Sequence, residues 1–199
     1  LSIVPHTKQI LLANTTNSTG YIFLTQRLPS EYWLSSIDIS CPSDTKSKIG
    51  IWMTKDFGQL GTAFGGPETF HGVGILLFHN QTNLSIEIRE NDGHANYSSD
   101  DFFPSIVKEL PTNEISLIIN YTSPILTIDL NISNSITNIY HDRPRIKVRR
   151  HWFSVTGENI GPRSVILRSI IFSGEKVPKI SNVPRVQKNA TQILSKKTL

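Results

Sequence analysis

The chain has 199 residues and a formal net charge of +4, and 38% of its residues are hydrophobic. A chain of this length can form one domain with a substantial core, and its apolar content is that of a globular protein. No apolar run approaches the roughly 20 residues of a membrane-spanning helix, and the small net charge argues against a nucleic-acid partner. We expect any membrane contact to come from a segment outside this sequence, and any signal peptide to have been removed before Leu1.

Cysteine and asparagine content give opposite indications of the compartment. Cys41 is the only cysteine, which excludes an internal disulfide or a cysteine zinc site and by itself suggests a reducing environment. The chain also has more N-x-S/T sequons than its Ser and Thr content predicts by chance, and acceptor asparagines belong on secretory surfaces. We therefore expect the lumen of the endoplasmic reticulum or Golgi, or the cell surface. The sequon asparagines are Asn14, Asn17, Asn80, Asn83, Asn96, Asn120, Asn131 and Asn189.

The first part of the chain predicts short strands separated by turns. Residues 1–17 have no clear role except for an expected edge strand at 10–12. Strands are also expected at 20–24 and 33–40, and the second alternates apolar and polar residues, as a strand with one solvated face does.

The other strands are organised around residues 49–78, which predict a strand, a glycine-rich crossing and a second strand. Residues 49–54 alternate apolar with small or polar residues, which indicates a half-buried strand. Residues 73–78 are continuously apolar, which suits a strand buried on both faces. Between them lie Gly58, Gly61, Gly65, Gly66 and Pro67, too many helix breakers for a helix.

The second half of the chain continues the strand pattern. Residues 84–90 alternate cleanly, and 115–121 with 125–132 predict a hairpin whose outward positions include two sequon asparagines. Residues 164–172 are apolar on both faces and are expected centrally in a sheet. The one short stretch that favours a helical turn is 102–110.

Five cationic residues lie between residues 143 and 150. Arg145, Lys147 and Arg149 alternate with apolar residues, so we expect a strand with a basic stripe on one side. Such a stripe suits an anionic partner, either a sulfated glycan, a lipid headgroup or an acidic peptide. The alternative, which we favour from the sequence, is an exposed sheet edge protected from aggregation by its charge.

These elements together predict an all-β fold, an antiparallel β-sandwich, over residues 1–177. Residues 178–199 contain lysines and prolines without a strong period, and we expect a C-terminal basic linker or tail.

The motif I-W-x-T-K-x-x-x-x-x-G-x-x-F-G-x-x-x-x-F-x-G-V-G-I, residues 51–75, closely resembles the signature of L-type (legume-type) lectin domains, nearest to the mannose-lectin cargo receptors that cycle between endoplasmic reticulum and Golgi. The resemblance begins before this motif, with a glycine-led strand, a proline and a tryptophan-led strand. It implies a concanavalin- or legume-lectin-like jelly roll.

The resemblance also implies a calcium site and a sugar site, and this chain departs from the family at both. The aspartate that holds calcium after the second strand of the motif corresponds to Phe78, beside Asn80, and the sugar-contacting aspartate before the first strand corresponds to Ser47. Calcium needs six to eight oxygen ligands, and phenylalanine offers none. We therefore expect no cofactor, with calcium binding disfavoured and Phe78 filling the space with apolar bulk.

Two further family motifs are matched in part. A tyrosine–aspartate–histidine run keeps its tyrosine but loses its acid, although Asp100 and Asp101 lie close enough in sequence to compensate. A Gly-Asp-Leu sugar loop keeps its glycine and has glutamate for aspartate. The matched positions are Tyr97, Ser98 and Ser99 for the first run, and Gly157, Glu158 and Asn159 for the second.

Catalytic and zinc chemistry have little support in the sequence. The histidines are scattered without metal-ligand spacing. Glu87 and Glu90 superficially resemble the catalytic strand of glycosidases with this fold, but a separation of three residues points them to opposite faces. We interpret them as solvent-facing charges and expect no enzyme.

The expected function is therefore recognition. The chain resembles the lectin domain of a membrane-anchored secretory-pathway cargo receptor, which would bind glycoprotein cargo or a glycan without calcium. The alternative is a diverged sandwich that binds a protein partner or has a structural role and no longer binds sugar.

Overall fold

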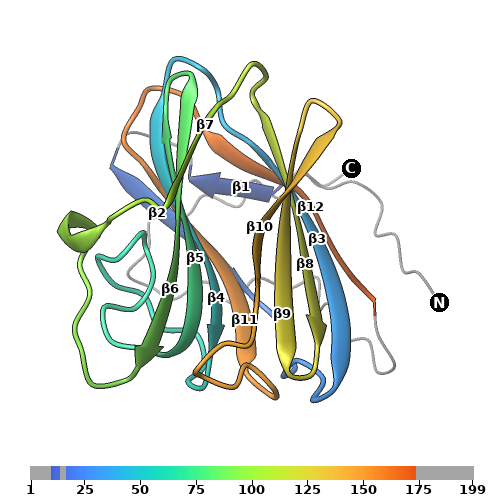
Figure 1. Cartoon of the computed structure of the whole chain (residues 1–199). Helices are drawn as coiled ribbons and strands as arrows, with labels where there is room; N and C mark the ends of the chain where they lie inside the picture. Colours follow the sequence, from blue (N-terminus) through green and yellow to red (C-terminus); the bar gives the residue numbers. More distant parts are fainter. Residues whose placement is uncertain (1–9, 14–16, 174–199) are drawn as a thin grey trace, which may run out of the picture.

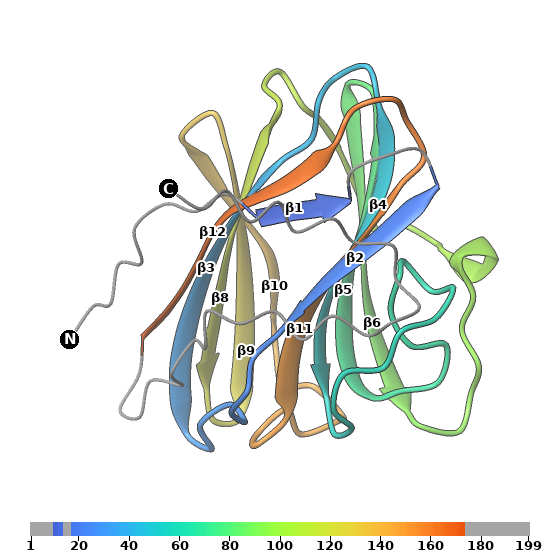
Figure 2. The same ribbon diagram turned by 180° about the vertical axis from the view of Figure 1, so that it is seen from behind.

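The computed structural model describes residues 10–13 and 17–173, which form two six-stranded antiparallel sheets. The sheets stack face to face, as Figures 1 and 2 show from opposite sides. The expected all-β antiparallel sandwich is thus confirmed. The part of the chain described here contains no helix with the length and hydropathy of a membrane span.

Each sheet mixes strands from both ends of the chain. Sheet A has the order β1 (Ile10–Ala13), β12 (Val165–Ser173), β3 (Tyr32–Ser40), β8 (Glu114–Thr122), β9 (Ile125–Ile132) and β10 (Ser135–Asp142). Sheet B has the order β2 (Ser18–Phe23), β11 (Trp152–Asn159), β4 (Lys46–Thr54), β5 (His71–Asn80), β6 (Asn83–Asp92) and β7 (Ile106–Glu109). The only helical element of the described residues is the short 3₁₀ helix η1 (Ser99–Asp101).

The main core lies between the two sheets and is built by the alternation of each strand. On β3 the residues Trp33, Ser35, Ile37 and Ile39 are buried, while Leu34, Ser36 and Asp38 between them are half-buried. The same period of two along β8 and β9 places Leu117 and Ile128 inside and polar residues outside.

Sheet B is buried on its outer face as well, around the side chain of Trp52. A Cβ atom added to Gly50, Gly66 or Gly74 would lie 2.3, 2.3 or 2.9 Å from an atom of the Trp52 ring. The indole is therefore packed directly against backbone contributed by two strands and the glycine-rich crossing. Only glycine leaves room for this approach.

The Trp52 ring is also positioned by a polar contact. Its Nε1 donates to the hydroxyl of Thr156 on β11 (2.8 Å), and that hydroxyl lies 2.7 Å from the carbonyl oxygen of Phe64 in the crossing. Phe70 meets the ring edge to face at 5.1 Å between centroids. Trp52 thus holds the 57–70 segment against sheet B, on the side away from sheet A (Figures 1 and 2).

Most of the predicted strands are found, with bounds that differ by a few residues. Residues 10–12 belong to the edge strand β1, and residues 73–77 of β5 are fully buried, as expected. The stretch 164–172 falls on β12, which lies between two other strands.

Three expectations are wrong. Residues 102–110 form no helical turn but lead into the edge strand β7, which pairs with β6. Residues 145–149 are not a strand but part of an irregular connection, so their charges protect no sheet edge. The edge strands of sheet A are β1 and β10, and β10 was not predicted because its composition is polar. The predicted tail at 178–199, and Asn14 and Asn189, lie outside the described residues.

We predict that Gly50→Ala lowers the free energy of unfolding by about 2 kcal/mol or more, because the new methyl group overlaps the Trp52 ring. Urea denaturation measures this loss. In a Trp52→Leu background the same substitution should cost much less, since the ring is gone. Equal costs in both backgrounds would show that Trp52 is not what excludes the methyl group.

Candidate ligand-binding site

The register of sheet B places one residue from each of its strands in a line across its outer face. This line, the outer row, consists of Thr19, Glu158, Lys48, Phe78, Ser85 and Val107. Phe78 and Glu158, both predicted from the sequence as site residues, are thereby brought together with only Lys48 between them.

The outer row combines an ion pair with apolar surface. Lys48 and Glu158 lie 3.8 Å apart with 22% and 29% of their side chains exposed. Phe78 is half-buried and packs at 6.2 Å between ring centroids against Phe102, while Val107 is 61% exposed. At its far end, Thr19 is covered by the 57–70 segment. The row therefore offers a short, shallow strip with charged, hydroxyl and aromatic groups.

Other predicted site residues share this end of sheet B but point into the sandwich. Ser47 and Asn159 pair with each other across β4 and β11, and both are fully buried. The Ser47 hydroxyl donates to the sulfur of Cys41 (3.9 Å), and the Asn159 amide donates to the Arg163 carbonyl (2.7 Å). Gly157 faces Leu12, whose Cδ2 lies 2.6 Å from where a Cβ would be.

Asn80 is the last residue of β5 and lies two residues beyond Phe78 of the outer row. Its side chain is half-buried, and its Oδ1 has no hydrogen-bond partner among the described residues. It pairs with Asn83 across the turn to β6, so two sequons flank this end of the sheet.

The predicted residues Tyr97, Ser98 and Ser99 belong to the 93–105 segment, which lies over β5 and β6. Ser98 caps η1, and its hydroxyl accepts from the amide of Asp100. Ser99 donates to the carbonyl of Thr62 (2.8 Å), so it ties this segment to the 57–70 segment. These three residues therefore hold the 93–105 segment in place and are not members of the outer row.

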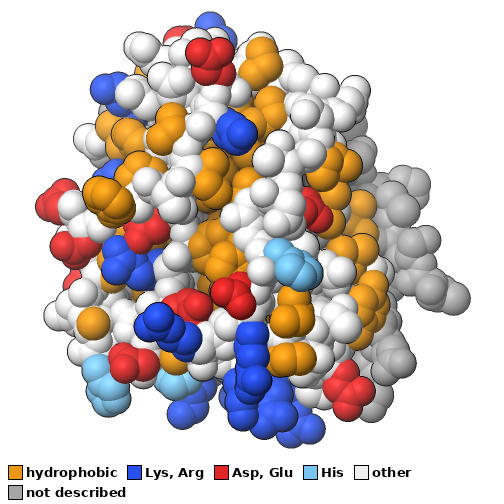
Figure 3. Space-filling model, in the orientation of Figure 1, with side chains coloured by type: hydrophobic (Ala, Val, Ile, Leu, Met, Phe, Trp, Pro, Cys, Tyr) orange, Lys and Arg blue, Asp and Glu red, His pale blue; other side chains and the backbone are white. Residues whose placement is uncertain are grey.

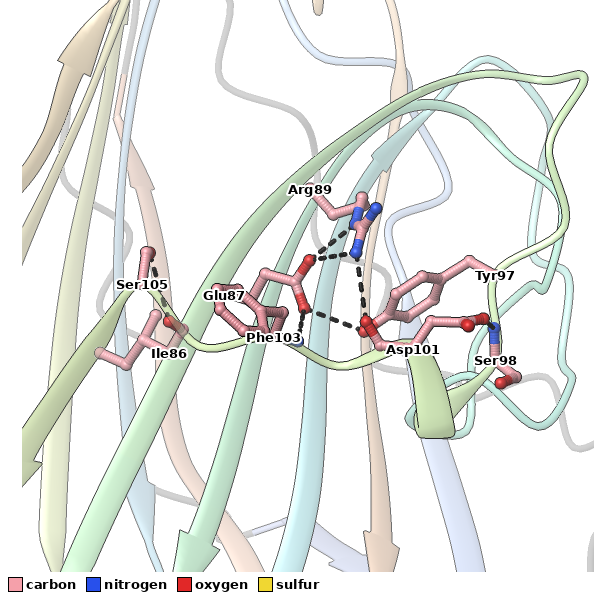
Figure 4. Close-up of polar contacts among 8 residues, drawn as sticks. All are labelled: Ile86, Glu87, Arg89, Tyr97, Ser98, Asp101, Phe103 and Ser105. Carbon is pink, nitrogen blue, oxygen red and sulfur yellow. Dashed lines mark hydrogen bonds and ion pairs between the residues drawn. The ribbon is translucent and has the colours of Figure 1, made fainter.

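The 93–105 segment is held to the sheet by Glu87, which sequence reasoning placed in solvent. This is wrong, since Glu87 is only 6% exposed. Its Oε2 accepts from the Tyr97 hydroxyl (3.1 Å) and the Phe103 amide (2.9 Å), and its Oε1 accepts from Arg89 (2.6 Å). Figure 4 shows the carboxylate at the centre of these contacts. The clue missed in the sequence was the nearby arginine on the same strand face.

The Glu87 carboxylate is buried and paired with Arg89, which is partly exposed. The Arg89 guanidinium lies 4.7 Å from the centre of the Tyr97 ring and also contacts the carboxylate. Burial, followed by the neighbouring Glu87 carboxylate, raises the pKa of Tyr97. Glu90, expected on the opposite face, does point away and accepts from Tyr140 and Ile146. Glu87 and Glu90 therefore both have structural partners, and they do not form the pair of free carboxyls that a glycosidase needs.

The residues present do not fit the calcium ion that the family implies. Phe78 supplies a ring where a carboxylate would stand, and Glu158 is paired with Lys48. The unpartnered Oδ1 of Asn80 is a single oxygen, against the six to eight that calcium takes. Over residues 10–13 and 17–173, no three His, Cys, Asp or Glu side chains cluster in a way that could hold a metal.

A separate open hollow of about 560 Å³ lies within the 57–70 segment, lined by residues 57–61 and 67–69. Its one acid, Glu68, accepts from the Thr62 hydroxyl (2.8 Å). None of the predicted site residues lines this hollow.

The sequon asparagines that the structure describes are all accessible. Asn17, Asn83 and Asn96 are exposed, and Asn80, Asn120 and Asn131 are half-buried. Asn120 and Asn131 lie on the outer face of sheet A, as the alternation of β8 and β9 predicted.

We predict that Glu87→Gln lowers the free energy of unfolding by about 1–3 kcal/mol, because the amide cannot accept from Tyr97, Phe103 and Arg89 together. Hydrogen exchange at the Phe103 amide should quicken more than at amides of β4. Glu109→Gln, at an exposed position on β7, is the control. Unchanged exchange at Phe103 would rule out Glu87 as the anchor.

We also predict that stability falls as the pH drops below about 6.5, the ordinary histidine pKa. Burial lowers the pKa of His79 and, with help from nearby positive groups, that of His151. The unfolded chain then binds protons that the folded chain does not, at up to about 1.4 kcal/mol per pH unit for each histidine. The His79→Leu variant should lose less stability between neutral and mildly acidic pH in urea titrations. An identical pH slope would contradict this.

The chain is similar to several solved structures and to one protein family. Solved structures that resemble it include the VIP36 exoplasmic/lumenal domain bound to Ca²⁺ and Man3GlcNAc, with a TM-score of 0.66, 15% identity, and coverage of 92% of this chain and 86% of that one. The potassium-bound carbohydrate recognition domain of Emp46p has a TM-score of 0.67 and 14% identity, over 83% and 84%.

A legume lectin-like domain from Entamoeba histolytica has a TM-score of 0.65 and 16% identity, over 88% and 87%. No curated protein matched the chain. The model of the legume-like lectin family matches residues 2–142. The chain therefore belongs to the legume-like lectin family.

Proposed function

We propose that this domain binds a glycan of a glycoprotein partner along the outer row of sheet B, without a calcium ion. The single observation behind this proposal is the register that lines up Glu158, Lys48 and Phe78 on the exposed end of the sheet. Sugar-binding surfaces combine apolar groups with a few placed polar ones, and this strip has both.

Each group of the strip has a distinct role in this proposal. The exposed part of the Phe78 ring, supported by Phe102, packs against the apolar face of a pyranose. Lys48 donates to sugar hydroxyls and Glu158 accepts from them, at the cost of a half-exposed ion pair that is worth little in water. No residue of the row acts as a nucleophile or a general acid, so the role is recognition and not catalysis.

The biological setting is part of the same proposal. VIP36 was solved as an exoplasmic/lumenal domain, and the sequons of this chain suit a secretory lumen. A lumenal lectin domain that binds a glycan without catalysing a reaction suits a cargo receptor of the endoplasmic reticulum and Golgi. Its membrane anchor would be a segment outside residues 1–199.

A glycan array probed with and without a calcium chelator tests this proposal. We expect binding that survives the chelator and falls at least about tenfold in Glu158→Gln and Lys48→Gln. The matched control is Arg168→Gln, which removes one partner of the exposed Arg168–Glu114 pair on the other sheet. Binding that requires calcium would refute the metal-free site, and equal losses in the control would refute the outer row.

A second candidate function is capture of a polypeptide at β7. This strand is one of the two edge strands of sheet B. Its residue Val107 is 61% exposed, and Phe103, three residues before the strand, is 80% exposed. An extended peptide could add a strand there and place side chains against these two residues. A domain that binds no glycan on the array but loses a protein partner on Val107→Lys would favour this function.

A further inference from the structure

The connection between β10 and β11 carries a concentrated positive charge at the end of the sandwich opposite the outer row. Glu158 lies six residues along β11 from Trp152, where this connection ends, so the two surfaces are about 20 Å apart. Figure 3 shows Lys and Arg side chains gathered at the bottom, where Figure 1 places this connection. The cationic loop consists of Arg143, Arg145, Lys147, Arg149 and Arg150, all of them exposed.

The cationic loop is irregular in its backbone but firmly seated. Pro144 and Val148 are buried and Ile146 is half-buried, so the residues between them are turned outward. The amide of Ile146 donates to Glu90 of β6 (3.1 Å). Because its apolar residues anchor it, the loop presents its charges as a preorganised row.

Further positive groups flank the loop. Arg27 donates to the carbonyl of Arg150 (3.2 Å) and lies 5.1 Å above the ring of Trp152. The amide of Lys55 donates to the carbonyl of His71 (2.8 Å), whose ring lies 6.1 Å from the ring of His151. Burial is the main cause of the lowered pKa of His151, and the charges of His71, Arg27 and Lys55 lower it further. The positive surface is therefore wider than the loop itself.

The two acids next to the loop offset part of its charge but form no ion pair with its cations. Glu90 accepts from the Tyr140 hydroxyl (3.4 Å) as well as from Ile146, and Asp142 accepts from the amide of Arg143 (2.6 Å). Among the described residues, no ion pair involves any of the five cations of the loop. The interpretation that these charges protect a sheet edge fails too, because the loop is not a strand.

We propose that the cationic loop binds a linear sulfated polysaccharide. Four of its five cations are arginines, whose planar guanidinium groups match the oxygens of sulfate in pairs. A row of separated charges, flanked by Arg27 and Lys55, suits an extended polyanion better than a single bound anion. This surface is independent of the outer row and of its proposed function.

The surroundings of the loop favour a polysaccharide over the other polyanions. An anionic membrane would take apolar side chains from a docking face, but Phe57, the exposed aromatic near Trp152, is packed against Trp152 and Phe23. The small net charge of the chain argues against nucleic acid. No sequon occurs between Asn131 and Asn189, so no N-glycan attached to this loop would cover it.

Binding of a size-defined heparin oligosaccharide, measured by calorimetry at several salt concentrations, tests the proposal. We expect binding that weakens with salt and falls at least about tenfold in the triple variant R145S/K147S/R149S. The matched control is K46S/R163S/R168S, which removes three exposed cations elsewhere and should bind as the parent does. Thermal melts should show both variants folded, because the substituted side chains are exposed.

Four outcomes would overturn the proposal. The first is heparin binding unchanged in the loop variant, and the second is equal loss in the control, which would mean that only total charge matters. The third is loop-dependent binding of phosphatidylserine vesicles without binding of heparin, which would assign the loop to a membrane. A desulfated oligosaccharide of the same length should bind more weakly, and equal binding would equally overturn the role of sulfate.

Discussion

The packing of Trp52 against glycine backbone is the constraint on which the outer face of sheet B depends. An indole lying flat on a sheet requires that its neighbours in the same strand and in the next strand have no side chains. Gly50 and Gly74 meet this requirement, and Gly66 lets the crossing close over the ring. The hydrogen bond from the indole to Thr156 then sets how far the crossing extends across β11. Gly50, Gly66 and Gly74 are thus a consequence of one aromatic side chain.

Two loop segments cover the outer face, and what they leave open defines the candidate site. The 57–70 segment is held by Trp52, and the 93–105 segment is held by Glu87 through the Tyr97 hydroxyl and the Phe103 amide. Together they cover the part of sheet B nearest the cationic loop. The outer row lies at their border, where Phe102 packs against Phe78 and the 57–70 segment packs against Thr19, so the two segments set its access to a ligand.

The sequence predicts the fold well because alternation and glycine positions are local signals. It predicts less of the site, since that depends on which strands pair. Phe78 and Glu158 lie 80 residues apart in sequence, and only the register of β5, β4 and β11 makes them neighbours. Ser47 matches a sugar-contacting position yet points inward to Cys41. The polar strand β10 and the irregular loop after it escaped prediction because their alternation does not indicate whether a partner strand is present.

The loss of calcium ligands and the way the 93–105 segment is held have one explanation. The resemblance to L-type lectins implies an ion that orders the loops near the sugar. Here Phe102 of that segment packs against both Phe78 and Phe64, and Glu87 satisfies the polar groups next to it. An aromatic cluster and a buried carboxylate thus provide the cross-links between sheet and loop that a metal would otherwise provide. These contacts are the reason why we propose recognition without calcium.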